Sequence, residues 1–373
     1  MAFINYRASY TIVILLVLLL LIRWYSVDRS TSLSFPNKYQ RDPRPSPGYL
    51  QRTGAQELSN FEDIEPYPKC THVLTLLPGG RWANTVMEYG SLYGVIKDHE
   101  GFRIKPVLND EMKTNLTEVF PNLSIPSFSE MGCSDKDLPF VTTEQVKAGF
   151  LKEKWEHPIL SLPKYWLRDK YFIPAIDDLK QNEFQFHPRL VQYVERGLQS
   201  AKEDFLKTRP GLDQVIFVGL HVRRTDYARY IKKHNGTAVT EHYFYKAMKM
   251  VRDKFGPSVV FVSATDDPKW TKSKFSKFPD VYFSSKMQMG KIDPVHFDFA
   301  LLSHCNHSIF SYGTFGYMTS ILAGGHVIAA NSYTVDKFYA INYARSERGQ
   351  NWTIMKDPTM KISLTNMNHF IGH

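Results

Sequence analysis

The sequence predicts an α/β protein with two lobes, each built on a parallel sheet. Short apolar runs typical of buried strands alternate with polar turns and helical segments, most clearly from residue 215 to residue 330. A strand–turn–helix unit of the same kind occurs in the other half of the chain, from residue 73 to residue 96. The chain has 373 residues, of which 43% are hydrophobic, and this is sufficient for two cores.

The first strand–turn–helix unit begins with the apolar strand Val73–Leu77. The polar turn Pro78–Asn84 follows, and a helix is predicted over Val86–Ile96. Glycines at such a turn allow the backbone to approach a ligand closely. An ordinary strand–turn–helix unit without a ligand is the alternative interpretation.

A cluster of polar residues directly follows the second buried run, Val215–Leu220. It contains His221, Arg223, Arg224 and Asp226. Open α/β sheets bind ligands at the carboxyl ends of their strands, and guanidinium groups match phosphate oxygens in pairs. The cluster therefore favours a phosphate or diphosphate site, with a solvated basic turn as the alternative.

Further strands are predicted over Val259–Thr265, Val281–Ser284, Ser308–Ser311 and His326–Ala330. The first of these runs into Asp266-Asp267, which either cap the next helix or contact a nucleotide.

A second anion site is predicted after Ser308–Ser311. Gly313 and Thr314 precede a helical run over Tyr317–Ala323. Free backbone N–H groups and the helix dipole both favour an anion at such a helix start. A basic crevice of this kind in a doubly wound domain indicates a nucleotide that carries a diphosphate.

Four ordered motifs resemble the galactoside α1,2-fucosyltransferase family, glycosyltransferase family 11. They are His221–Tyr227, Asp298–Ser308, Tyr312–Gly316 and Leu322–Gly325. The resemblance extends from about residue 73 to residue 335, and parts of it are shared with α1,6- and protein O-fucosyltransferases. It implies a GT-B-like fold of two facing Rossmann-like lobes, with an acceptor-side lobe at 70–206 and a GDP-fucose-binding lobe at 207–373.

The turn after Val73–Leu77 is similar to the GRxGNQ turn of fucosyltransferases. Arg81 and Asn84 match that pattern, whereas Ala83 replaces its second glycine and Thr85 replaces its glutamine. The Ala83 side chain calls into question the close backbone approach that a glycine would permit.

The resemblance implies transfer of L-fucose from GDP-β-L-fucose to the 2-hydroxyl of a terminal galactose, with inversion. It assigns Arg223 to the β-phosphate, with Arg224 beside it, and Gly313 and Thr314 to the phosphates at a helix start.

The family also assigns Arg81 and Asn84 to the leaving-group side, and His221 and Asp298 to the guanine or ribose. Asp226 is predicted to orient Arg223 or Arg224. The two acidic candidates for a general base are Asp226 and Glu88, and a base is unnecessary if proton transfer comes late.

No metal or cofactor is expected, because cationic side chains and a helix terminus supply the positive charge. The pair Asp135 and Asp137 matches a metal-binding DxD pattern but lacks a preceding apolar strand. The net charge of +9 is dispersed, without a run of five Lys or Arg, so nucleic acid is not an expected partner. The expected partners are GDP-fucose, a galactose-terminated glycan of a glycoprotein or glycolipid, and membrane lipid; homo-oligomerisation stays open.

Two other functions are compatible with the sequence. One is a fucosyltransferase of different linkage or acceptor, such as a protein O- or core fucosyltransferase. The other is an inactive membrane-bound binder of nucleotide sugars or glycans. Five aromatic residues of the first lobe either stack on acceptor sugars or pack inside the protein: Trp155, Tyr165, Trp166, Tyr171 and Phe172.

The amino terminus is predicted to be a type II membrane anchor in the Golgi. Residues 1–7 form a cytosolic tail, 8–27 an apolar transmembrane segment, and 28–69 a proline-containing luminal stem. A cleaved signal peptide is the competing interpretation, but bulky Arg23-Trp24-Tyr25 offers no small-residue cleavage site.

A luminal location makes glycosylation sequons usable. The predicted acceptors are Asn115, Asn122, Asn235 and Asn351, whereas Asn306 is expected to be buried and unmodified.

The chain has three cysteines, so a luminal protein has at most one internal disulfide. A bridge between Cys70 and Cys133 is one possibility, and Cys305 lies in an apolar stretch typical of a core residue.

Overall fold

The computed structural model describes residues 70–357 except 135–138, 153–154, 156, 234–237, 288–289 and 332–338. These residues belong to one compact unit of the chain. The predicted anchor at 8–27 and stem at 28–69 lie outside the described residues. Within the described part, no helix has the length and apolar character needed to cross a membrane.

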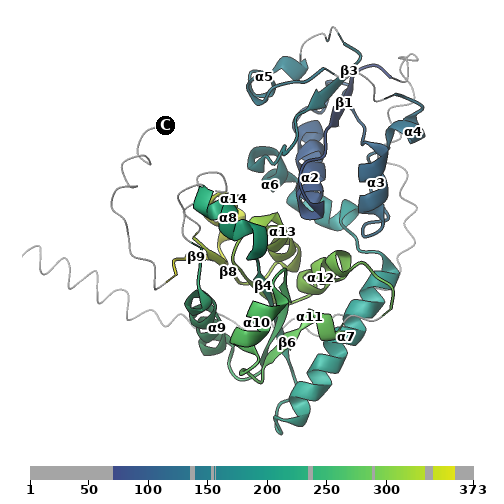
Figure 1. Ribbon diagram of the computed structural model, residues 1–373. Helices are drawn as coiled ribbons and strands as arrows, with labels where there is room; N and C mark the ends of the chain where they lie inside the picture. The colour runs from purple at the N-terminus through teal and green to yellow at the C-terminus, as the bar shows by residue number, and fades with distance from the viewer. Residues whose placement is uncertain are drawn as a thin grey trace, which may run out of the picture. The chain divides into compact units, whose positions relative to one another are not determined.

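The amino-terminal lobe contains β1 and β3 of Figure 1. It is built on a three-stranded parallel sheet with the strand order β2-β1-β3. The strands are β1 (Val73–Leu76), β2 (Lys105–Pro106) and β3 (Ile159–Leu162). The helices are α2 (Trp82–Asp98), α3 (Asp110–Thr117), α4 (Phe128–Met131), α5 (Thr143–Lys147) and α6 (Asp169–Asp178), with short turns at Phe150–Lys152 and Leu179–Glu183.

Helix α2 begins earlier than the sequence predicted. The residues from Trp82 to Asn84 were expected in the turn, but they lie in the first turn of the helix, with Arg81 at its N-cap. The helix packs closely on α6, where Gly94 faces the backbone carbonyl of Tyr171 and leaves no room for a side chain.

Helix α7 (Pro188–Lys207) connects the two lobes and packs against α11 and α12 of the second. The second lobe has a six-stranded, fully parallel sheet with the order β6-β5-β4-β7-β8-β9. The strands are β4 (Ile216–Val222), β5 (Val259–Thr265), β6 (Val281–Phe283), β7 (His307–Phe310), β8 (Val327–Ala330) and β9 (Trp352–Met355).

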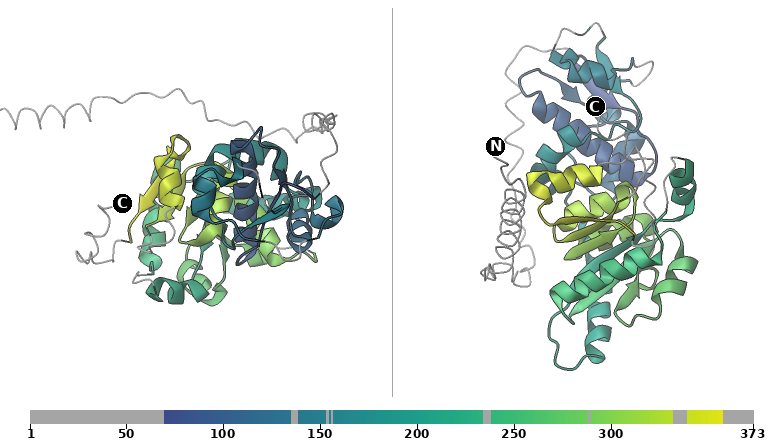
Figure 2. Two further views of the ribbon diagram at one scale, coloured as in Figure 1. Left: turned by 90° about the horizontal axis from the view of Figure 1, so that it is seen from above. Right: turned by 90° about the vertical axis from the view of Figure 1, so that its left-hand side faces the viewer.

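The helices of the second lobe cover both faces of its sheet (Figure 2). They are α8 (Thr225–Lys233), α9 (Glu241–Phe255), α10 (Pro268–Phe275), α11 (Ser284–Met287), α12 (Pro294–Ser303), α13 (Gly313–Ala323) and α14 (Tyr339–Arg345), with a short turn at Glu347–Gly349. Strand β4 illustrates the layering, because Leu220 packs with the α8 and α9 side while Gly219 faces Leu302 of α12 on the other side. The predicted α/β fold with parallel sheets is therefore confirmed.

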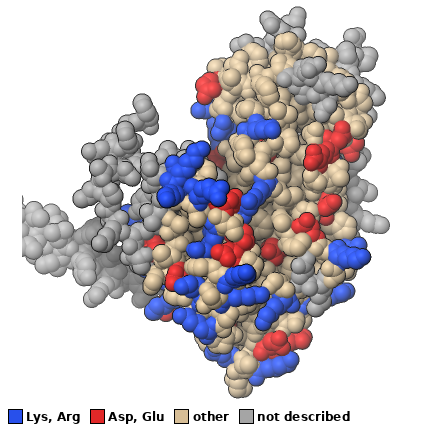
Figure 3. Space-filling view, viewed as in Figure 1, with Lys and Arg blue, Asp and Glu red and all other residues tan. Residues whose placement is uncertain are grey.

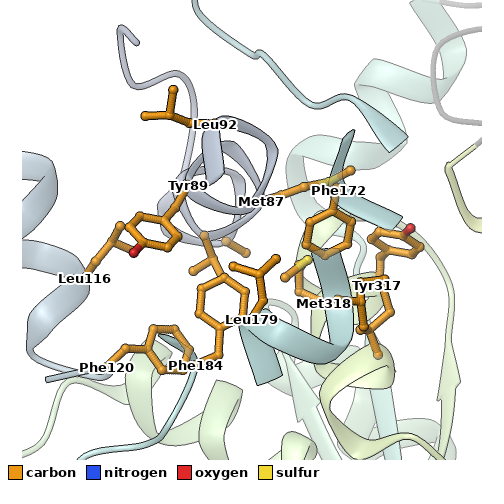
Figure 4. Close-up of a cluster of buried hydrophobic side chains, with 14 of the residues drawn as sticks. Met87, Tyr89, Leu92, Leu116, Phe120, Phe172, Leu179, Phe184, Tyr317 and Met318 are labelled. Atoms are coloured by element: carbon orange, nitrogen blue, oxygen red, sulfur yellow. The ribbon is translucent and has the colours of Figure 1, made fainter. Parts of the chain in front are cut away.

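The two lobes share one hydrophobic core (Figure 4). Met87 and Tyr89 of α2 belong to the same buried cluster as Phe172 of α6 and Tyr317 and Met318 of α13. Helix α2 therefore packs directly on α13 of the second lobe. The first turns of these two helices follow β1 and β7, so the packing brings the carboxyl edges of the two sheets together.

Candidate active site

The turn after β1 places Arg81 and Asn84 at the start of α2. Gly80 has a φ of +80°, and a side chain on it would collide with the amide nitrogen of Asn84 and lie 2.7 Å from the Tyr165 ring. The positive φ favours glycine at this position, and any side chain there would have to displace the Asn84 amide and the Tyr165 ring. The conformation of this turn is therefore specified by its sequence, and the exposed Arg81 directly follows it.

Buried Glu88 holds this turn from below. Its two carboxylate oxygens accept hydrogen bonds from the backbone N–H of Gly79, each at 3.1 Å, and Oε1 also accepts one from Tyr165 N at 2.7 Å. Burial raises the pKa of Glu88 to about 7, although these backbone N–H groups act in the opposite direction.

The predicted catalytic role of Glu88 does not fit this position. Its side chain is completely buried, and its oxygens are occupied by backbone donors, so it cannot reach a substrate hydroxyl. The helical spacing that the sequence shows does not reveal which side of α2 faces the turn. Glu88 is a structural residue that fixes the turn.

The departures from the GRxGNQ pattern lie on the helix itself. Ala83 is 4% exposed and packs in the shared core, and the Thr85 hydroxyl donates to the carbonyl of Trp82 at 2.5 Å. Neither substitution changes the Gly79–Gly80 turn, where the tight backbone geometry is found.

Arg223 lies at the centre of a charged network after β4. Its Nη2 is 2.6 Å from Asp226 Oδ1, and its Nη1 is 2.9 Å from Asp266 Oδ2. The other oxygen of Asp226 pairs with Arg81 Nη2 at 3.0 Å. Asp226 therefore orients Arg223, which was one of its two predicted partners. It also links Arg223 to Arg81 of the other lobe.

Arg224 has different partners. Its Nε lies 3.3 Å from Asp267 Oδ2, and its guanidinium stacks 3.8 Å above the Trp270 ring. Asp267 also caps α10 by accepting a hydrogen bond from Trp270 N at 3.1 Å. Asp267 therefore plays one of its two predicted roles, that of a helix cap.

Asp266 holds the turn that follows β4. It accepts hydrogen bonds from the backbone N–H of Arg224 at 2.8 Å and of Thr225 at 3.2 Å. On the other side of β4, Arg223 N donates to Ser311 Oγ at 3.0 Å. Sequence reasoning missed Ser311, although its position at the end of β7 would place it on the same sheet edge.

The start of α13 is the position at which the sequence predicts a second anion site. Gly313 has a φ of +83°, and Tyr312 at the N-cap makes no side-chain capping hydrogen bond. The Thr314 hydroxyl donates to Asn84 Oδ1 at 2.5 Å, across the two lobes. Asn84 and Thr314, which are 230 positions apart in sequence, are therefore in direct contact.

His221 is buried, and Asp298 is partly buried. His221 stacks on Phe315 with ring centroids 5.0 Å apart, and its buried Nδ1 has no hydrogen-bond partner among the described residues. Burial and the charge of Arg223 lower the pKa of His221 to about 3, so the ring is neutral. Burial raises the pKa of Asp298 to about 7, against a hydrogen bond from Ser284.

The remaining predicted positions are distributed over the surface and core. Asn115, Asn122 and Asn351 are exposed, whereas Asn235 and the pair 135/137 lie outside the described residues. Among the described residues, no group of three potential ligands could hold a metal ion. Lys and Arg side chains are intermingled with Asp and Glu on the face seen in Figure 3, as the dispersed sequence charge indicated.

Asn306 corrects one expectation, because it is exposed. It lies between α12 and β7, and its Oδ1 accepts a hydrogen bond from Phe217 N at 2.9 Å. The apolar residues around it suggested burial, but they point into the core while the loop itself reaches the surface. Cys70 and Cys133 form a disulfide, which the sequence left as one possibility, and Cys305 is a buried free thiol, as expected.

Comparison with known proteins identifies the family. The model of glycosyl transferase family 11 matches residues 152–356. Galactoside alpha-(1,2)-fucosyltransferase 1 of Bos taurus is 29% identical over 270 residues, which cover 70% of this chain and 69% of that protein. Galactoside alpha-(1,2)-fucosyltransferase 2 of Mus musculus is 27% identical over 281 residues, or 73% of this chain and 75% of that protein.

Solved structures resemble the chain more distantly. The crystal structure of the fucosyltransferase NodZ from Bradyrhizobium aligns with a TM-score of 0.40 and 14% identity, over 66% of this chain and 91% of that chain. POFUT1 in complex with GDP aligns with a TM-score of 0.40 and 10% identity, over 69% of this chain and 96% of that chain. The family match covers more than half of the chain and confirms the resemblance seen in its motifs. This protein is therefore a member of glycosyl transferase family 11.

Proposed function

We propose that the protein transfers L-fucose from GDP-β-L-fucose to the 2-hydroxyl of a terminal galactose on a glycoprotein or glycolipid glycan, with inversion. One observation carries the proposal. The ion pairs of Asp226 with Arg81 and Arg223, and the Asn84–Thr314 hydrogen bond, join the two lobes where both sheets end in polar turns. The fucosyltransferase names of the family relatives supply the sugar and the linkage.

The network suits a departing diphosphate. Arg223 uses one hydrogen on each of two nitrogens for Asp226 and Asp266, so other donors of its five remain for phosphate oxygens. The uncapped start of α13 adds backbone N–H groups and the positive end of a helix dipole. Each fixed donor of this kind typically lowers a barrier by about 2.7–4 kcal/mol when charge develops in front of it.

In the transfer step, the bond between fucose C1 and the β-phosphate oxygen breaks, and GDP leaves with the electron pair. The galactose 2-hydroxyl oxygen forms the new bond to C1 from the opposite face, which converts β to α. Asp226 has both oxygens occupied by arginines, so we assign it the positioning of Arg81 and Arg223. The hydroxyl proton leaves to solvent after the new bond has formed.

We further propose that the reaction requires no divalent metal, because Arg81, Arg223 and the α13 start supply the positive charge. The apolar segment at 8–27 supports a type II anchor in the Golgi membrane with the catalytic part in the lumen.

The proposal is tested with the full-length chain in detergent. GDP should bind, GDP-fucose should hydrolyse slowly without acceptor, and galactose-terminated acceptors should receive fucose in α1,2 linkage by product analysis. Another linkage would assign the chain to a different fucosyltransferase activity. Binding of GDP without hydrolysis or transfer would make it a binder rather than an enzyme.

A further inference from the structure

Tyr165 differs from the other aromatic residues that the sequence marked as possible sugar contacts. Trp155, Trp166, Tyr171 and Phe172 are buried, and each is at most 8% exposed. Tyr165 is 55% exposed, although it directly precedes the fully buried Trp166. Packing inside the protein therefore explains four of the five aromatic residues and leaves Tyr165 unexplained.

The backbone holds Tyr165 in an unfavourable conformation. Its φ is +61°, in the left-handed region that costs a non-glycine residue roughly 1–2 kcal/mol. The buried carboxylate of Glu88 fixes this conformation by accepting the Tyr165 N–H at 2.7 Å. Strain of this kind persists only where the surroundings impose it, and it is concentrated at ligand sites.

The Tyr165 ring lies beside the turn of the candidate active site. A side chain on Gly80 would lie 2.7 Å from Tyr165 Cε1, and it would also collide with Asn84 Nδ2. The oxygen of the same Asn84 amide accepts the hydrogen bond from Thr314. The Asn84 side chain therefore lies between two parts of the site. Its oxygen faces the predicted phosphate site, and its nitrogen lies on the side of the Tyr165 ring.

We propose that Tyr165 is the platform on which the acceptor galactose stacks; this inference rests on the proposed function. A β-galactoside carries the C3–H, C4–H and C5–H bonds on one face, and this apolar face matches an aromatic ring. Tyrosine offers a large rigid surface with few rotatable bonds, which limits the entropy lost on binding. The donor diphosphate is expected at Arg223 and at the start of α13, on the Thr314 side of Asn84.

Glu88 then couples the two halves of the site. Its carboxyl group accepts hydrogen bonds from the backbone of Gly79, in the turn beside Asn84 that we call the donor turn, and from the backbone of Tyr165, the proposed acceptor platform. The donor turn and the acceptor platform are therefore held at a fixed separation by a single buried side chain.

The experiment compares Tyr165→Phe, Tyr165→Ala and Tyr165→Asn with the unchanged full-length chain, and lactose is the acceptor. The asparagine variant tolerates the left-handed backbone and guards against misfolding of the alanine variant. Phe140→Ala is the control, because Phe140 is a similarly exposed aromatic residue of the same lobe, at 58%. The measured quantities are the KM for lactose, the KM for GDP-fucose, kcat, and the rate of GDP-fucose hydrolysis without acceptor.

We expect the KM for lactose to rise roughly 3- to 10-fold in the Ala and Asn variants, on the scale of a lost aromatic contact. The Phe variant and the Phe140→Ala control should match the unchanged chain. The KM for GDP-fucose and the hydrolysis rate should stay within about twofold, because binding of the donor is not affected.

An unchanged KM for lactose in both folded Ala and Asn variants overturns the inference. A rise confined to the KM for GDP-fucose also overturns it, because the ring would then contact the donor. Equal losses in the Phe and Ala variants assign the effect to the hydroxyl and reject stacking. Failure of the unchanged chain both to hydrolyse GDP-fucose and to transfer fucose to lactose is a separate result, which rejects the proposed function itself.

Discussion

Replacement of Arg223 by lysine is the most direct test of the charged network. The two terminal nitrogens of Arg223 contact different carboxylates, Asp226 at 2.6 Å and Asp266 at 2.9 Å. Lysine keeps the charge but has one nitrogen on a flexible stem, so it cannot hold both carboxylates and also present a planar pair of donors to a phosphate.

The expected loss of stability follows from the solvent exposure of the two aspartates. Asp226 is 52% exposed and Asp266 is 18% exposed, so solvent screens the first pair strongly and the second less. The free energy of unfolding should fall by only about 1 kcal/mol, the scale of partly exposed ion pairs. The contact with the departing diphosphate strengthens as the glycosidic bond breaks, so kcat should fall by roughly 10²- to 10³-fold.

The assay measures kcat and KM for fucose transfer beside urea unfolding. Arg252→Lys is the matched control, because Arg252 also holds a carboxylate with two nitrogens, Asp280 at 2.7 and 2.9 Å, and it lies on α9. The control should lose similar stability and keep its kcat. A folded Arg223→Lys protein with nearly normal kcat would refute the assignment of the phosphate to Arg223.

Three further predictions concern pH, the disulfide and metal ions. Because Glu88 has a pKa of about 7 in the folded protein and about 4.5 when unfolded, its protonation stabilises the fold at pH 5, and this stability is lost as pH rises through 7. Glu88→Gln should therefore be less stable than the unchanged chain by a margin that narrows between pH 5 and pH 8 in urea titrations; a constant or widening margin would contradict this. Replacing both Cys70 and Cys133 by serine should lower the free energy of unfolding by about 2–4 kcal/mol, and an unchanged urea midpoint would show that the bridge contributes nothing. Transfer rates should be equal before and after EDTA treatment, whereas activity that returns only with added Mn²⁺ would show that a metal is required.

The sequence alone predicted the strands β4 to β8 of the second lobe, but not β9 or the order of the strands in the sheet. Apolar β-branched runs predicted β4, β5 and β7, and the polar residues directly after them predicted which edge of the sheet carries the chemistry. These features are local, since a strand and the turn that follows it are neighbours in the chain. The family motifs fall on the same segments, so the family could be recognised before the fold was known.

Tertiary structure decided which side chains meet and which are hidden. The pairing of Arg81 with Asp226 and of Asn84 with Thr314 depends on the packing of α2 against α13, a contact between segments more than a hundred residues apart. Glu88 was a predicted candidate for a general base, yet the packing of α2 buries it under the turn.

The sequence also could not predict the solvent exposure of single loop residues. Asn306 lies in an apolar stretch but reaches the surface, and Tyr165 lies beside the buried Trp166 but is exposed. In both cases one adjacent residue, Cys305 or Trp166, is buried, because a loop can reverse the direction of successive side chains within one residue. Periodicity predicts faces only within regular helices and strands, so the exposure of loop residues is decided by the three-dimensional packing of the chain.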